Sequence, residues 1–240
     1  MPIQTLNNPR LYQQAAEQIV LLIQSGEYSV GTKLPAERDL ARQLGVSRPT
    51  VREALIALEI QGHVEVRIGS GSVVKNASAG RAGPGRASLD VGPSPFEVLS
   101  ARRIIEPPIA AMAAATITPA ELSALMETLD LLKGEPRSHA ANLEADRAFH
   151  TQIAEATHNA IVIDMIARLW EGMFGGIFAA LTQRTTVRHD QQMTYNDHSE
   201  IVRCFERRDA PGAAAMMTAH LIHAEMKLLH NGDRPDSVLG

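Results

Sequence analysis

Residues 76–92, NASAGRAGPGRASLDVG, divide the chain into two parts. They consist largely of Gly, Ala, Ser, Pro and Arg, and they offer almost no side chain that a hydrophobic core could bury. This composition is typical of a flexible linker. We therefore expect two domains, residues 1–75 and 93–232, followed by a short tail at 233–240.

The composition favours a helical chain outside the membrane. Apolar residues make up 45% of the chain and aromatic residues only 4%, which favours helices rich in Ala, Leu and Ile. The longest strongly apolar run, Ile109–Ile117, is much shorter than the roughly 20 residues that span a bilayer. The start of the chain has no apolar core of a secretory signal, and the single Cys204 allows no internal disulfide. We expect a cytoplasmic protein with no membrane contact.

The net charge of −4 is unevenly distributed. Residues 1–76 carry eight basic and seven acidic side chains, whereas the remainder carries fifteen and twenty. A surface that binds nucleic acid must therefore be local, because the chain as a whole is not basic.

The first part has the pattern of three helices and a hairpin. Apolar side chains recur at helical intervals over residues 11–26. A second helix is expected from Pro35 to Gly45, and a third from Ser47, its N-cap, to Gly62. Residues 63–75, HVEVRIGSGSVVK, alternate on both sides of Gly-Ser-Gly, as a β-hairpin does.

This order of elements is that of a winged helix-turn-helix, which binds DNA. The N-terminal residues of the third helix would reach base edges and phosphates in the major groove. Arg48 can contact guanine through two hydrogen bonds, while Ser47 and Thr50 suit phosphates. Arg38 and Arg52 would flank them. Taken alone, the segment also fits a capped surface helix with solvated charges.

The motifs LPAERDLARQLG, GVSRPTVREAL and RIGSGSVV, in this order, resemble the GntR family of bacterial transcription regulators. The resemblance covers about residues 1–75. Ile68 departs from the family, which often has a polar residue before the wing glycine. The resemblance implies DNA contacts at Arg38, Ser47, Arg48, Thr50, Arg52 and Gly69.

The second part is predicted to be an all-α bundle, so the fold class is mainly α. Its first helix begins at a Ser-Pro cap near residue 94, with a kink expected at Pro107–Pro108. The helix that follows is capped by Thr118 and Pro119. Further helices are expected at about 138–157, 160–182, 191–208 and 210–230.

Four polar side chains of this bundle fall on apolar stripes. Asp146 and His150 are four residues apart and share one face of their helix. His198 and His220 lie on the apolar stripes of two other helices. A carboxylate and three imidazoles that point inward would satisfy one another around a divalent metal ion.

Other interpretations stay open at this point. A single inward histidine is usually a hydrogen-bonded core residue, and His223, three residues after His220, is a rival ligand. The remaining histidines, His158, His189 and His230, are expected at helix ends or in loops, in contact with solvent.

The second part is similar to the ligand-sensing FCD domain of the FadR-type GntR regulators. The motifs D-x-x-[FY]-H (146–150), D-H-x-x-I (197–201) and a late-helix histidine stand in order. In many members the matching residues, here Asp146, His150, His198 and His220, bind zinc, nickel or a similar metal. Arg102 matches an arginine that commonly pairs with the carboxylate of the effector, whereas Arg103 would face elsewhere. Residues 89–102 and 153–162 look like those of hexuronate and aldonate regulators, which implies a sugar acid as effector.

These observations favour a regulator over an enzyme. We expect a homodimer on a pseudo-palindromic DNA operator, with repression released by a small carboxylate. One alternative is a regulator for which the metal ion itself is the signal. A more remote one is a metal-dependent hydrolase, but Glu144 and Glu155 do not share the face of Asp146 and His150, so no general base is at hand.

Overall fold

The computed structural model describes residues 10–67, 71–75, 91–133, 138–182 and 187–230, with the side chains of 139, 187–191 and 230 excepted. Two compact units are formed, one up to Ser94 and the other from Pro95 onward. Most of the predicted linker, 76–90, and the predicted tail lie outside the described residues.

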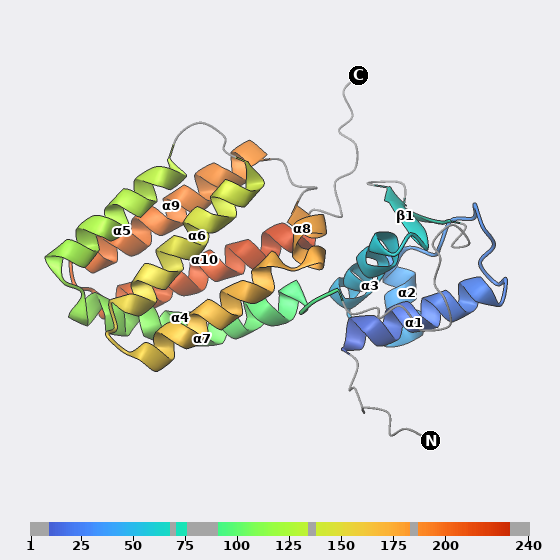
Figure 1. Ribbon diagram of the computed structural model, residues 1–240, viewed down its shortest axis with the longest axis horizontal. Helices are drawn as coiled ribbons and strands as arrows, with labels where there is room; N and C mark the ends of the chain where they lie inside the picture. The colour runs from blue at the N-terminus through green and yellow to red at the C-terminus, as the bar shows by residue number, and fades with distance from the viewer. Residues whose placement is uncertain (1–9, 68–70, 76–90, 134–137, 183–186, 231–240) are drawn as a thin grey trace. The chain divides into compact units, whose positions relative to one another are not determined.

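In its described residues the first unit has three helices and a two-stranded sheet (Figure 1). Helix α1 spans Leu11–Gln24, α2 spans Glu37–Leu44 and α3 spans Arg48–Ile60. Strand β1 (Val64–Arg67) pairs antiparallel with β2 (Gly71–Val74). The winged helix-turn-helix expected from the sequence is therefore confirmed as a fold.

Local signals set the ends of α2 and α3. Helix α2 begins two residues later than expected from Pro35, because Ala36 is its N-cap residue. It ends at Gly45, whose φ of 67° is the left-handed conformation that glycine adopts most readily. Helix α3 has the expected N-cap, since the Ser47 hydroxyl accepts a hydrogen bond from the Thr50 N–H.

One apolar cluster joins these elements. Ile19 of α1, Leu40 of α2, Leu58 of α3 and Val74 of β2 are at most 1% exposed and belong to the same cluster. Helix α3 is thereby fixed against both the other helices and the sheet, which holds its first turn in a defined position.

The residues just before α4 are bonded to the first unit. The Tyr12 hydroxyl donates to the Gly92 carbonyl at 2.8 Å and accepts from the Val91 N–H at 3.3 Å. The buried Ser94 hydroxyl donates to Glu53 of α3 at 2.5 Å. Residues 91–94 are thus bonded to α1 and α3 of the first unit.

The second unit is a bundle of helices (Figure 1). Helix α10 packs along α4 and against α9, α5 packs against α6 and α9, and α6 also contacts α7. None of the helices in the described part of the chain is long and apolar enough to cross a membrane. The helices are α4 (Pro95–Thr116), α5 (Pro119–Leu132), α6 (His139–Glu155), α7 (Ala160–Glu171), α8 (Gly176–Thr182), α9 (Val187–Glu206) and α10 (Ala210–His230).

Two details of the observed helices differ from what helical periodicity alone predicts. The single helix expected at 160–182 is broken by a 3-10 turn at Gly172–Phe174 and by the extended Gly175, because glycine has a low helix propensity. Pro107 and Pro108 lie inside α4, which continues through them as one helix. Thr118 caps α5 as expected, accepting from the Glu121 N–H.

Candidate functional site

The second unit gathers four polar side chains at one place. His150 of α6, His198 of α9 and His220 of α10 are 2%, 0% and 4% exposed, and Asp146 lies one turn before His150. One ligand atom from each residue lies within 4.8 Å of the others. Among the described residues, this is the group of carboxylates and imidazoles that could hold a metal ion.

The three imidazoles meet through their Nε2 atoms. The His220 Nε2 lies 3.2 Å from that of His150 and 3.3 Å from that of His198. Asp146 Oδ1 lies 3.2 Å from the His198 Nε2 and 3.7 Å from the His150 Nε2. Ligands of one tetrahedral zinc ion, at 2.0–2.2 Å from it, would be about 3.3–3.6 Å apart. Four of the six spacings, at 3.2–3.7 Å, are therefore close to the edges of one coordination sphere, and the other two are at most 4.8 Å.

The chemistry of these atoms also suits a divalent cation. Asp146 Oδ1 is buried and has no hydrogen-bond partner among the described residues, which is costly for a carboxylate oxygen. Nitrogen and oxygen ligands of this kind are the ones that zinc and nickel accept. The four residues fit the metal ion that the sequence predicts.

Burial keeps two of the imidazoles neutral. Desolvation lowers the pKa of His198 well below its ordinary value, and the positive charges of neighbouring groups lower it further. Desolvation also lowers the pKa of His220, although the nearby Asp197 carboxylate acts in the opposite direction. Phe149 stacks on the His198 ring with the centroids 4.1 Å apart. Neutral imidazoles have the lone pair that a metal ligand needs.

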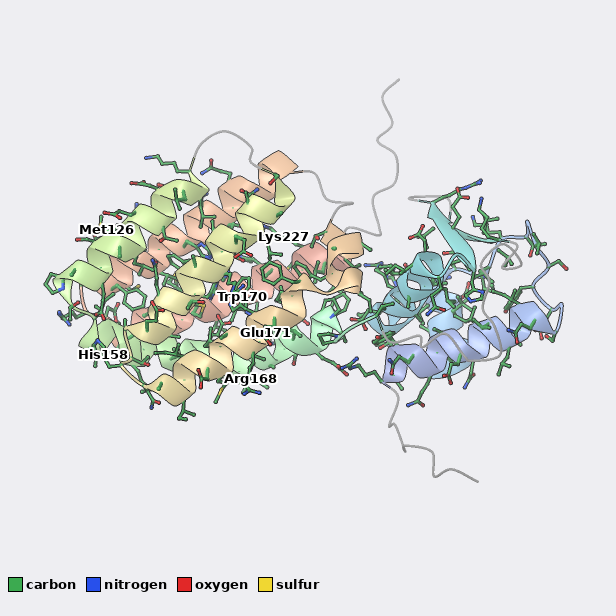
Figure 2. All side chains as sticks on the ribbon, in the orientation of Figure 1. Met126, His158, Arg168, Trp170, Glu171 and Lys227 are labelled. Atoms are coloured by element: carbon green, nitrogen blue, oxygen red, sulfur yellow. The ribbon has the colours of Figure 1, made fainter. Side chains whose placement is uncertain are left out.

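Arg102, the expected effector contact, is held inside the bundle. Its side chain is 1% exposed, its Nε donates to Glu106 at 2.6 Å, and its guanidinium lies 4.1 Å from the centroid of Trp170. Trp170, labelled in Figure 2, is fully buried, and its indole N–H has no hydrogen-bond partner within the described chain. Arg103 is half exposed and pairs with Glu225 at 3.0 Å, so it does face elsewhere.

Glu106 is a residue that sequence reasoning did not assign to the site. Its carboxylate is 2% exposed, and its Oε2 lies 2.6 Å from the His150 Nδ1. Burial raises the pKa of Glu106, but the positive charges of Arg102 and His150 outweigh it and lower the pKa well below its ordinary range. The only sequence signal was the four-residue spacing from Arg102, which allows an ion pair on one helix.

The structure separates the two rival histidines of α10. His220 joins the cluster, whereas the His223 Nδ1 is 2.9 Å from Asp197 Oδ2 and its side chain is 42% exposed. His158 lies in the turn after α6, is half exposed and contacts Glu121 at 2.9 Å. The side chains of His189 and His230 lie outside the described residues.

Three of the six expected DNA contacts, Ser47, Arg48 and Thr50, lie at the start of α3. Ser47 and Arg48 are exposed, and the Ser47 hydroxyl is 2.8 Å from that of Thr50. Arg38 of α2 is 76% exposed in its side chain. Gly69 lies outside the described residues, as does Ile68.

Arg52 differs from these residues because it is buried. Its side chain is 8% exposed and donates two hydrogen bonds to Glu37 of α2, at 3.1 and 2.7 Å. Glu37 also lies 3.9 Å from the Arg48 guanidinium. This geometry joins α2 to α3, and a DNA contact by Arg52 stays a prediction.

Comparisons with known proteins find a matching family for each of the two domains. Residues 11–74 match the bacterial regulatory proteins of the gntR family, and residues 97–223 match the FCD domain. The Exu regulon transcriptional regulator of Escherichia coli (strain K12) is 34% identical over 222 residues, which cover 92% of this chain and 85% of that protein. The Uxu operon regulator of Haemophilus influenzae is 32% identical over 228 residues, covering 95% and 85%. The solved structure of E. coli McbR/YncC has the same fold, with a TM-score of 0.51 at 21% identity over 94% of this chain and 100% of that one.

The buried imidazoles make the stability of the metal-free second unit depend on pH. The lowered pKa values of His198 and His220 mean that the folded chain binds fewer protons than the unfolded chain near their ordinary pKa. The free energy of unfolding should therefore be highest above about pH 6.5 and decrease as the pH drops below that value. Urea unfolding with a chelator, at about pH 7.5 and about pH 5.5, measures this. Equal stability at both values would contradict the burial of neutral imidazoles, and His198→Leu should flatten the dependence.

Proposed function

We propose a function for this chain from the premise that it belongs to the gntR family of bacterial regulatory proteins and carries an FCD domain. It is a DNA-binding transcription regulator of the cytoplasm whose helical domain senses a small carboxylate with the help of a divalent metal ion. The observation that carries the proposal is the cluster of Asp146, His150, His198 and His220 in a chain that also has a winged helix-turn-helix.

Helix α3 is the element proposed to read the operator. Arg48 is exposed at its first residue, where a guanidinium can contact guanine in the major groove. Ser47 and Thr50 stand at the N-terminus of the helix, where the helix dipole favours a phosphate. We propose a homodimer on a pseudo-palindromic operator, because two-fold symmetry of protein and site is the usual arrangement for such readers.

Arg52 is proposed to act mainly within the protein. Its two hydrogen bonds to Glu37 fix the angle between α2 and α3. A contact with DNA would require the buried guanidinium to give up its two hydrogen bonds to the partly buried Glu37 carboxylate, which is unfavourable.

The metal ion is proposed to be zinc or nickel, held by Asp146 and the Nε2 atoms of His150, His198 and His220. Once bound, it would supply a positive charge that attracts an anionic effector. The chain's own part is to keep the imidazoles of His198 and His220 neutral and to direct three imidazoles at one point inside the bundle.

The effector is proposed to be a sugar acid, of the hexuronate or aldonate class. Glu106 contacts both Arg102 and the cluster residue His150, so Arg102 is one side chain away from the cluster. Its guanidinium is suited to binding a carboxylate. The curated relatives are named for the Exu regulon and the Uxu operon, which agrees with the class that the sequence predicts. In the free protein Glu106 takes the place of the effector carboxylate at Arg102, so the effector has to compete with it.

A gel shift at fixed salt tests the whole proposal, with purified protein and the DNA upstream of its own gene. We expect a specific shift that one member of a panel of hexuronates and aldonates releases. A shift that responds to added zinc or nickel and to none of the acids would favour the alternative in which the metal ion is the signal. Equal shifts of the specific and the random DNA would contradict the proposal that the chain is a sequence-specific regulator.

Arg48→Ala should weaken binding to the specific DNA by about 1–3 kcal/mol, with a smaller loss on random DNA, because a base contact is removed. Fluorescence anisotropy on the two DNAs measures this. Arg42→Ala removes the same charge from an exposed residue of α2 and is the control. Equal losses on both DNAs would mean that Arg48 contacts only phosphate.

His150→Ala and His220→Ala should each abolish stoichiometric zinc, because each removes one nitrogen of a four-residue group. The measurement is metal content after dialysis against a weak chelator, on proteins whose helical circular dichroism is unchanged. His158→Ala, in the exposed turn after α6, should retain the metal. Stoichiometric zinc in the first two variants would refute the ligand assignment.

A further inference from the structure

One buried carboxylate lies between the metal cluster and the expected effector contact. Glu106 Oε1 is 2.6 Å from the Arg102 Nε, and Glu106 Oε2 is 2.6 Å from the His150 Nδ1. The side chains of Glu106 and His150 are both at most 3% exposed. Glu106 belongs to neither proposed ligand set, yet it contacts a member of each.

The distance to His150 determines where a proton must lie. A nitrogen and an oxygen 2.6 Å apart repel each other unless a proton is between them. Arg102 donates to the same carboxylate and favours its ionised form. When the His150 ring carries one proton, that proton therefore belongs on Nδ1, which leaves the lone pair on Nε2, the atom that faces the cluster.

The three rings differ in what lies behind them. The Nδ1 atoms of all three, His150 included, are buried without a hydrogen bond of good geometry among the described residues. The His220 Nδ1 faces Asp197 Oδ2, but at 3.6 Å, while the same oxygen is 2.9 Å from His223. Of the three ligand rings, His150 is the one with a carboxylate in close contact behind it.

We propose that Glu106 is a positioning residue for metal binding. It holds His150 with the proton on Nδ1 and the ring directed into the cluster, so that Nε2 is ready to accept the ion. Arg102, itself packed on Trp170, holds Glu106 in place. Such a carboxylate behind a metal-ligating histidine both fixes its tautomer and strengthens it as a ligand. This inference rests on the metal site of the proposed function.

The tautomer can be measured on the unaltered protein. In the metal-free full-length chain with ¹⁵N-labelled histidine, at about pH 8, the His150 signals should show a protonated Nδ1 and an unprotonated Nε2. His150→Gln identifies those signals by their loss. A proton on Nε2 would overturn the proposal. This measurement needs no metal, so it decides whether the Nδ1 proton of His150 faces Glu106 separately from whether the cluster binds a metal ion.

The variant Glu106→Gln should bind zinc about 10- to 100-fold more weakly in competition with a chromophoric chelator. Its His150 signals should also lose the fixed Nδ1–H pattern, a change that a merely structural role of Glu106 would not produce. Glu121→Gln is the matched control, because Glu121 contacts His158 in an exposed carboxylate–histidine pair far from the cluster ligands. Zinc affinity equal to that of the unaltered protein would overturn the proposal. If Glu106→Gln does not fold, the tautomer of the unaltered protein decides.

Discussion

The meeting of three imidazole Nε2 atoms inside the bundle is the constraint on which the second half of the chain depends. The His150, His198 and His220 side chains come from three helices, so α6, α9 and α10 must pack in one register for the atoms to converge. Buried polar atoms with few partners are unfavourable in an apolar core. In the proposed function a divalent ion offsets this cost, which couples the packing of the bundle to what it binds.

Both units use an arginine–glutamate pair to place a functional side chain. In the first, Arg52 holds Glu37, and Glu37 faces Arg48 at the start of α3. In the second, Arg102 holds Glu106, which contacts a cluster histidine. The Arg102–Glu106 pair is buried on both sides, so breaking it would leave a charge uncompensated, whereas Glu37 is partly exposed. An effector that attracts Arg102 away from Glu106 would therefore change the surroundings of the metal cluster directly.

Much of this arrangement follows from the sequence, because helical periodicity is a local property. Periodicity predicts that Asp146 and His150 share one inward face. The position of Ser47 just before a helix predicts its role as the N-cap. Periodicity could not separate His220 from His223, because residues three apart lie on neighbouring faces of a helix. Nor could it reveal that Glu106 contacts His150, since that depends on how α4 packs against α6. The pairing of Arg52 with Glu37 likewise depends on how two helices pack. Because of this pairing Arg52 is buried, although the sequence places it at the DNA surface.

The most direct test of the central claim is anomalous X-ray diffraction from crystals of the full chain grown with zinc. We predict one strong peak within ligand distance of the Nε2 atoms of all three cluster histidines and of an Asp146 carboxylate oxygen. A peak bound instead by His223 and Asp197, or crystals with full-occupancy zinc only at surface residues, would contradict the site.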